Sequence, residues 1–359
     1  MPLVSRFAAI RAFILLAVLP CAVTPSIGQQ VESRRLQPSL GLGIDIGLTG
    51  SHQDFLIPHP LSDPSVTPEH PLYMRLLVPW RHIERRPGEY DWRWLDRLVD
   101  QYRSADHVIV LVPYGRNAAI APRQPLPDAA SPVVLKHWLE FLRAMAFHFE
   151  GRVRYYEIWD EPNREPEWSG AGVVDYAYLL KNSSVTVRSA DPEAMIVQGG
   201  LAMAGGDSAA LDWQKALFSL ETATYIDVLS VHPAAGVPFA GQVGQLYDLL
   251  LTADPSAQLW VTAVPLQGAA DRARAGELIE GFVSAQGNGA TVVTFALQPG
   301  ADRRPELPGV LLDLHKLFLP AYGLVHGDRL KFEAVDASDA PQPPGVTSFH
   351  FFDAESFQG

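Results

Sequence analysis

The chain has 359 residues, of which 47% are hydrophobic, and its formal net charge is −12 at pH 7. A chain of this length can bury a large core, and one α/β barrel of about 250 residues with additions fits it as well as two domains would. The acidic balance argues against nucleic acid or an anionic membrane surface as a partner, because both attract clustered lysine and arginine.

The first residues have the pattern of a secretory leader. Arg6 and Arg11 precede an apolar run at 12–23, and small or turn residues follow. This order predicts a signal peptide at residues 1–28 and therefore a secreted or cell-envelope protein, with an uncleaved anchor as the alternative. The run is shorter than the roughly 20 residues of a membrane span, and no other stretch is apolar enough to form one. Cys21 is the only cysteine, so cleavage would leave a chain without disulfides or thiol catalysis.

Beyond the leader, strand-like and helix-like segments alternate. Short apolar runs rich in β-branched residues predict strands at 40–46, 73–78, 107–113, 153–159, 194–198, 226–231, 259–264 and 291–297. Amphipathic periodicity predicts helices at 92–103, 132–149, 173–190, 211–220, 242–251, 272–286 and 310–318. Eight such units predict an α/β fold, a closed (β/α)8 TIM barrel over residues 36–320, rather than an open doubly wound sheet.

The C-terminal part of the chain changes character after residue 322, where the helical periodicity ceases. Two strand-like segments at 329–335 and 346–352 flank a proline-rich turn. They predict a short β-rich appendage at 321–359, or the beginning of a further module that the chain truncates.

The segment 155–163, Tyr-Tyr-Glu-Ile-Trp-Asp-Glu-Pro-Asn, is the most informative stretch of the chain. Asp160 and Glu161 end an apolar and aromatic run, and Pro162 stops the strand because proline cannot donate to a sheet ladder. The two carboxylates therefore lie at the C-terminal tip of a strand, which is where α/β barrels place their chemistry. Regular alternation of side chains predicts that Asp160 and Glu161 face opposite sides of the strand.

Three passages match a known group of enzymes. The first runs from Met-Arg-Leu-Leu-Val-Pro-Trp at 74–80 to Asp96, the second is Glu-Ile-Trp-Asp-Glu-Pro-Asn at 157–163, and the third, weaker one is Val-His-Pro at 231–233. With these motifs the chain resembles the retaining glycoside hydrolases built on (β/α)8 barrels, the broad clan of cellulases, β-xylosidases and β-galactosidases. The resemblance covers residues 40 to about 319, and its motifs are specific for the fold and the clan but not for a substrate.

The resemblance implies roles for several residues, and it also implies a loss. In this group the glutamate of the fourth strand is the general acid/base, which falls on Glu161. The residue before it is a sugar-binding asparagine, where this chain has Asp160. The nucleophile is a glutamate at the end of the seventh strand, and the matching position is Ala263. A tyrosine of the sixth strand and a tryptophan of the eighth are replaced as well. Retaining hydrolysis needs two carboxyl groups about 5–5.5 Å apart, so the resemblance implies that this reaction is lost.

Three functions remain open on the sequence. The first, favoured by the coincident departures from the motif, is a barrel that binds a polysaccharide or oligosaccharide with little or no hydrolysis. The second is an active glycosidase with Glu161 as the acid and a second carboxylate as the base, for which Asp45, Asp160, Glu165 and Glu167 are candidates. The third is a non-catalytic scaffold of the cell envelope.

Polar residues around the motif are expected to contact the ligand. Arg75 follows the alternation of its strand, so its side chain either meets a sugar hydroxyl or, as we favour, pairs with Glu161. Asn163, which completes the motif, and His232, at a strand tip, are further expected substrate contacts.

Aromatic side chains suit the apolar face of a sugar ring. Trp80 and Trp168 are the expected stacking residues, whereas Trp159 is expected in the core. No histidines have metal-ligand spacing, no serine lies in a G-x-S-x-G context, and no phosphate-binding glycine loop opens a helix. The resemblance implies a carbohydrate partner, and no motif predicts a metal or another cofactor.

Overall fold

The computed structural model describes residues 41–46, 72–121, 123, 126–127, 131–164, 168, 172–203, 208–234, 239–265, 282, 285–297, 330–331 and 352–353. The chain forms two compact units, Met1–Leu36 and Gln37–Gly359, and every described residue belongs to the second. The predicted leader at 1–28 and the predicted helix at 310–318 lie outside the described residues. The predicted domain boundaries stay predictions.

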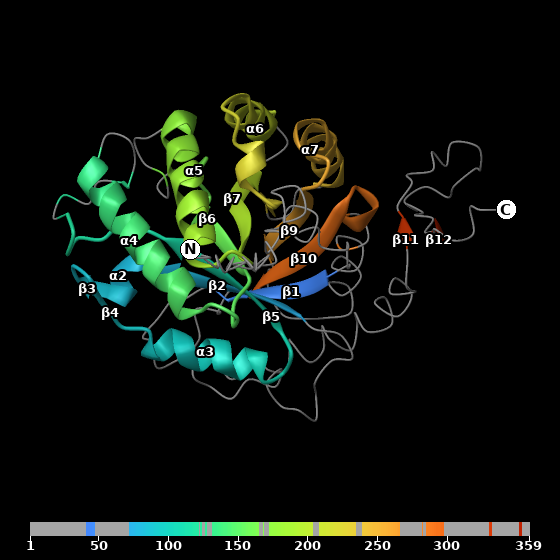
Figure 1. Cartoon of the computed structure of the whole chain (residues 1–359). Helices are drawn as coiled ribbons and strands as arrows, with labels where there is room; N and C mark the ends of the chain where they lie inside the picture. Colours follow the sequence, from blue (N-terminus) through green and yellow to red (C-terminus); the bar gives the residue numbers. More distant parts are fainter. Residues whose placement is uncertain are drawn as a thin grey trace, which may run out of the picture. The chain divides into compact units, whose positions relative to one another are not determined.

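Eight parallel strands form a closed barrel, with the order β1-β10-β9-β8-β7-β6-β5-β2 and β2 paired back to β1 (Figure 1). The strands are β1 (Gly41–Ile46), β2 (Tyr73–Pro79), β5 (Val108–Tyr114), β6 (Tyr155–Asp160), β7 (Met195–Met203), β8 (Val228–Pro233), β9 (Gln258–Pro265) and β10 (Ala290–Leu297). Each of them overlaps a predicted strand. Both faces of the sheet are covered, which is why the strands are nearly continuous apolar runs. The predicted α/β fold of (β/α)8 type is confirmed.

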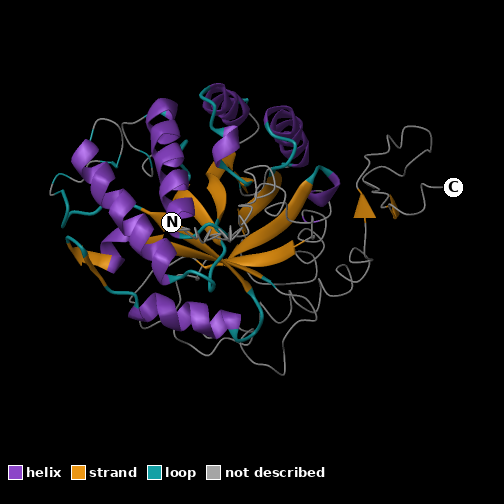
Figure 2. Ribbon diagram, in the orientation of Figure 1, coloured by secondary structure: helices purple, strands orange, loops and turns teal. Residues whose placement is uncertain are grey.

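Helices form a layer outside the strands (Figure 2). Those described are α2 (Trp80–Ile83), α3 (Arg93–Arg103), α4 (Pro132–His148), α5 (Val173–Ala190), α6 (Ala209–Ser219), α7 (Ala240–Ala253) and the short 3-10 helix η2 (Ala223–Tyr225). Residues 282 and 285–287 are also helical, at the end of the segment predicted at 272–286. In the part of the chain that the structure describes, no helix is long and apolar enough to cross a membrane.

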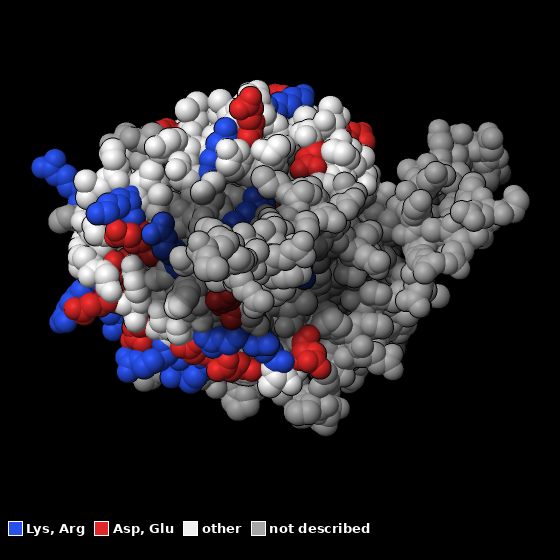
Figure 3. Space-filling model, in the orientation of Figure 1, with Lys and Arg blue, Asp and Glu red and all other residues white. Residues whose placement is uncertain are grey.

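Two small sheets lie outside the barrel order. The hairpin of β3 (Glu84–Arg86) and β4 (Glu89–Tyr90) follows α2, and β11 (Leu330–Lys331) pairs antiparallel with β12 (Phe352–Asp353). The latter pair involves both of the segments predicted as C-terminal strands. On the face drawn in Figure 3, acidic and basic side chains of the described residues are intermingled.

The inside of the barrel is aromatic near the start of its strands and charged further along. Tyr73, Tyr155 and Trp260 come from three strands and meet there, with Tyr73 and Tyr155 ring centroids 5.2 and 4.9 Å from that of Trp260. Residues two positions apart on a strand share a face, so the next inward residues after Tyr73 and Tyr155 are Arg75 and Glu157. Inside the barrel, the charged side chains thus lie nearer the C-terminal ends of the strands than the aromatic ones do.

Candidate functional site

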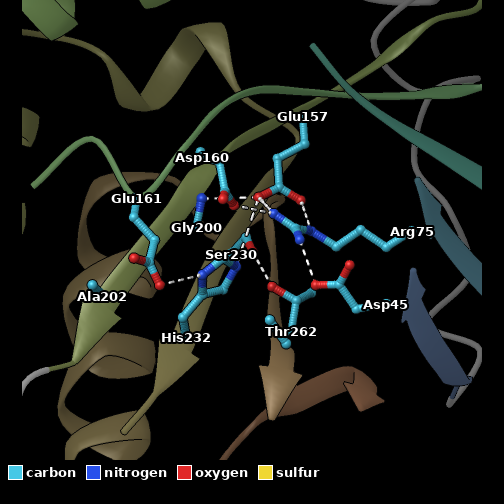
Figure 4. Close-up of polar contacts among 12 residues, drawn as sticks. Asp45, Arg75, Glu157, Asp160, Glu161, Gly200, Ala202, Ser230, His232 and Thr262 are labelled. Atoms are coloured by element: carbon cyan, nitrogen blue, oxygen red, sulfur yellow. Dashed lines mark hydrogen bonds and ion pairs between the residues drawn. The ribbon is translucent and has the colours of Figure 1, made fainter. Parts of the chain in front are cut away.

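Arg75 lies inside the barrel and joins three carboxylates from two other strands (Figure 4). Its Nε and Nη2 donate to the two oxygens of Glu157 at 2.8 and 2.9 Å, and Nη2 also donates to Asp160 Oδ1 at 2.7 Å. Nη1 donates to Asp45 Oδ2 at 2.5 Å. Burial opposes the charge of Arg75, but the carboxylates of Asp45, Glu157 and Asp160 outweigh it and raise the pKa of the guanidinium. Burial raises the pKa of Asp45, with Arg75 opposing that rise.

These contacts correct two expectations for Arg75. It does pair with carboxylates, as we favoured, but its partners are Asp45, Glu157 and Asp160 and not Glu161. Only 1% of the residue is exposed, so it has no surface to offer a sugar hydroxyl. Arg75 therefore holds the acidic side chains in place instead of contacting the ligand.

The backbone of β6 departs from regular alternation at its C-terminal tip. Trp159 has φ 72° and Glu161 has φ 46°, both in the left-handed region that costs a non-glycine residue about 1–2 kcal/mol. Ile158 and Trp159 both pack on the helix side of the sheet, while Glu157 and Asp160 both reach Arg75. The expectation that Asp160 and Glu161 face opposite sides was therefore wrong, because the positive φ of Trp159 turns Asp160 inward.

Glu161 is held between two basic groups. Its Oε1 lies 3.3 Å from His232 Nδ1, and its Oε2 accepts a hydrogen bond from Arg164 Nη1 at 2.9 Å. On the other side of the imidazole, His232 Nε2 lies 3.9 Å from Glu157 Oε1. The His232 ring rests against Gly200, where an added Cβ would overlap it. His232 thus lies at the strand tips, as expected. It is only 5% exposed and is held between two glutamates, which corrects its expected role as a substrate contact.

The two partners shift each other's pKa in opposite directions. Burial raises the pKa of Glu161, but the hydrogen bond and charge of His232, with the charge of Arg164, outweigh it and lower the pKa from its ordinary 4.5. Burial lowers the pKa of His232, but the hydrogen bond to Glu161 outweighs it and raises the pKa above 6.5. At a pH between these two pKa values, the proton of the pair is therefore on His232 and not on Glu161.

Ala263 occupies a strained position near the end of β9. Its φ is 54°, and its N–H donates to Thr294 Oγ1 at 3.1 Å. The pairing of β9 with β10 shifts register at this point. One residue earlier, Thr262 exchanges a 2.6 Å hydrogen bond with the hydroxyl of Ser230 inside the barrel. Hydroxyl groups and a methyl group, and no carboxylate, therefore line this stretch of β8 and β9.

Asn163 is engaged with the backbone of β7. Its Nδ2 donates to the carbonyl oxygen of Ala202 at 2.9 Å, and its Oδ1 accepts from the N–H of Ala202 at 2.8 Å. This reciprocal pair fixes the turn after β6 to the neighbouring strand. Asn163 is a structural clamp, which corrects its expected role as a substrate contact.

The two expected stacking tryptophans are both buried. Trp80 is 0% exposed, packs against Trp138 and Phe141, and donates to Glu84 Oε2. Trp168 is 3% exposed and lies edge-on against Trp159. Both rings belong to the core between the strands and the helices, so their assignment to sugar stacking is corrected. Trp159 is in the core, as predicted.

Two residues of the site were missed on the sequence. Glu157 is fully buried and binds Arg75 and the N–H of Gly200, and the signal for it was an acid two positions after Tyr155 on the same face of the strand. Tyr114 ends β5 and is half-buried. The sequence carried no signal for it, because only the register of β5 with β2, which pairs Tyr114 with Pro79, places it at the strand tips.

The described residues include one group with the composition of a metal site. Single ligand atoms of Glu157, Asp160 and His232 lie within 4.8 Å of one another. Arg75 donates to both carboxylates and puts a fixed positive charge beside them. A cation would have to displace or approach that guanidinium, so the arrangement does not fit a metal ion.

Comparison with known proteins places the barrel among glycoside hydrolase folds. No family model matches the chain. A beta-xylosidase of Geobacillus stearothermophilus is 26% identical over 130 residues, which are 33% of this chain and 25% of that protein. The chain thus spans only a quarter of this curated relative.

Solved structures show the same fold at low identity. A family 39 glycoside hydrolase from Bacteroides cellulosilyticus superposes with a TM-score of 0.56 and 18% identity over 76% of this chain and 58% of that one. An exo-beta-1,4-mannosidase from an Opitutaceae bacterium superposes with a TM-score of 0.54 and 16% identity, over 80% of this chain and 59% of that one. Xylanase 10B from Thermotoga petrophila superposes with a TM-score of 0.52 and 14% identity, over 76% of this chain and 85% of that one. The chain has a glycoside-hydrolase-like fold whose structural neighbours act on carbohydrates.

Proposed function

We propose that the chain is an exported glycoside-hydrolase-like barrel that recognises a polysaccharide or oligosaccharide at the C-terminal ends of its strands, with hydrolysis lost or strongly reduced. The observation that carries this proposal is the position of Glu161, whose carboxylate lies between His232 and Arg164, and both of these groups lower its pKa. A general acid must hold a proton at the working pH, which needs a raised pKa and not a lowered one.

The missing second carboxylate supports the same conclusion. A retaining reaction needs an attacking carboxylate, and the methyl group of Ala263 cannot attack an anomeric carbon. The acids that the structure describes nearby are committed elsewhere, since Asp45, Glu157 and Asp160 all bind Arg75. The side chain of Asp160 is 19% exposed, but its direct neighbour in the chain is the proposed acid itself. Glu165 and Glu167, the other candidate bases, lie outside the described residues.

Binding needs fewer groups than hydrolysis, and those groups are present. Carboxylates accept hydrogen bonds from sugar hydroxyls, and Asp160 and Glu161 are both partly exposed at the strand tips. The Arg75 network and His232 hold them in fixed positions, which reduces the entropy lost when a ligand binds. Export is supported by the leader-like sequence at 1–28.

The test compares turnover with binding. Release of reducing sugar from a panel of polysaccharides would be measured for the wild type, Glu161→Gln and the control Glu89→Gln, an exposed acid on β4, with glycan binding measured in parallel. We expect binding without turnover, weakened by Glu161→Gln and unchanged by the control. Turnover abolished by Glu161→Gln would refute the binding-only function and identify an active glycosidase. No binding to any glycan would leave only a scaffold.

A second variant tests the assignment of Ala263. If this position has lost a nucleophile, Ala263→Glu should give measurable hydrolysis of an aryl glycoside with a good leaving group, which needs little acid assistance. In the double variant with Glu161→Gln, the first turnover should still release the aryl group. Later turnovers should be slow, because no base activates the water that hydrolyses the glycosyl-enzyme. The control is Ala263→Gln, which has no carboxylate. If Ala263→Glu hydrolysed the aryl glycoside no faster than this control, Ala263 would not be the position of a lost nucleophile.

A further inference from the structure

Tyr114 is placed at the same end of the barrel as the acids. On β2 and β5, Arg75 is paired with Val110 and Pro79 with Tyr114, so the tyrosine is four residues closer to the C-terminal ends, or about 13 Å. Residues two and four positions apart on a strand share a face, so Tyr114 lies on the same inward face as Val110, the residue paired with Arg75. On β5 and β6, Leu111 is paired with Tyr156, which puts Tyr114 level with the residue before Asp160.

The electrostatics of Tyr114 agree with this placement. Burial raises the pKa of its phenol, and the negative charge of Asp160 raises it further, with Arg81 and Arg75 opposing. Both acidic and basic groups of the strand tips therefore act on the same ring. The alignment of the strands places Tyr114 near Asp160, and the effect of the Asp160 charge on its phenol agrees with that placement.

Both groups have unused binding capacity. Tyr114 is half-buried, with part of its ring against the core, and within the described part of the chain its hydroxyl has no hydrogen bond. Asp160 uses Oδ1 for Arg75, while Oδ2 has no partner among the residues that the structure describes. The strand register thus brings an aromatic face near a carboxylate oxygen that the described residues leave unused. This is the combination that binds the apolar and the hydroxyl side of a sugar ring.

The acids also determine which charge a ligand can carry. Carboxylates only accept hydrogen bonds, so a ligand must present donors to Asp160 and Glu161. A uronic acid would bring a third carboxylate toward these two. Arg164 and His232 offset part of the charge of Glu161, and Arg81 also acts on Tyr114, but like charges at close range are unfavourable. Sugar hydroxyls meet both requirements.

We propose that Tyr114 and Asp160 form a subsite for a neutral sugar unit, in which the ring of Tyr114 stacks on the sugar and Asp160 Oδ2 accepts from its hydroxyls, and that this subsite rejects uronic acids. The proposal deepens the proposed function and rests on it. It supplies the aromatic contact for which Trp80 and Trp168 are not available.

The test is calorimetric titration of the full chain with xylohexaose, mannohexaose, cellohexaose and an oligogalacturonate of the same length. Variants are Tyr114→Leu, Tyr114→Phe and Asp160→Asn, and the matched control is Tyr178→Leu, a tyrosine on the exposed side of α5. We expect Tyr114→Leu to weaken binding of the best neutral ligand at least tenfold and Tyr114→Phe only a few-fold. The control should stay within twofold of the wild type, and Asp160→Asn should narrow the discrimination against oligogalacturonate.

The outcomes separate the two proposals. If the wild type binds a neutral glycan and Tyr114→Leu binds it as the control does, the subsite is wrong while the proposed function stands. If oligogalacturonate binds as tightly as the neutral ligands, the charge argument is wrong. If the wild type binds no glycan, both proposals fail. A Tyr114→Leu variant that does not fold leaves the decision to Asp160→Asn, which must change the preference between neutral and acidic ligands.

Discussion

Removing the guanidinium of Arg75 should be the most destabilising single change at this site. Arg75→Leu would leave Asp45, Glu157 and Asp160 without their shared cation, and two of these acids are almost completely buried. Removing one partner of a buried ion pair costs about 3–5 kcal/mol, because a charge stays behind without compensation. Folded proteins have about 5–15 kcal/mol of stability in total. We therefore expect a loss of at least about a fifth of the free energy of unfolding.

The loss should depend on pH in a defined direction. Burial already raises the pKa of Asp45 and Arg75 opposes that rise, so without Arg75 the folded-state pKa of Asp45 would rise further. Groups with raised pKa cost no stability below their unfolded pKa and destabilise progressively as pH rises through the folded pKa. The deficit of Arg75→Leu should therefore be smaller at pH 5 than at pH 7. Arg75→Lys keeps the charge but not the planar fork, so its loss should be intermediate.

Urea unfolding followed by circular dichroism at both pH values measures this deficit. The control is Arg86→Leu, whose ion pair with Glu89 is exposed and long at 3.4 Å, and which should leave the midpoint unchanged. A loss of less than about 1 kcal/mol for Arg75→Leu, or the same loss at pH 5 and pH 7, would contradict the stabilising role of the network.

Three further changes test the strand tips. Gly200→Ala puts a methyl group into the ring of His232 and should cost about 1–3 kcal/mol, and an unchanged urea midpoint would show that the ring can move aside. Ala263→Gly removes the strain of a left-handed backbone but raises the entropy of the unfolded chain, so we expect a net gain in stability of up to about 1 kcal/mol. A loss of stability would mean that the methyl group of Ala263 makes favourable packing contacts. His232 contributes fully to the free energy of unfolding below pH 6.5, and this contribution is lost as pH rises through its raised pKa. Glu161 contributes fully above pH 4.5, and its contribution is lost as pH falls through its lowered pKa. The stability difference between wild type and His232→Asn should therefore peak between those values, and a flat difference would contradict the ion pair.

The sequence predicted the barrel because its signal is local. Each strand is an apolar run bounded by turns, and each described helix has its own periodicity, so no knowledge of distant residues is needed. The position of Glu161 and His232 at strand tips follows from the same local reasoning.

The contacts inside the barrel could not be predicted in this way. The partners of Arg75 depend on how three strands are aligned, which no single segment encodes. The inward turn of Asp160 depends on one backbone torsion at Trp159, which overrides the two-residue period. Trp80 looked like a sugar-binding residue because the same aromatic side chain suits a ligand and a core, and only its neighbours distinguish the two.

The torsion at Trp159 also means that the strand tips are adjusted from outside the barrel. The ring of Trp159 is held by Trp138 of α4, whose Nε1 donates to Ser183 of α5. A change in either helix that moved the ring of Trp159 would therefore act on Asp160 without touching it. Selection acting on these outer residues could retune the affinity for a ligand while every residue in contact with that ligand stays the same.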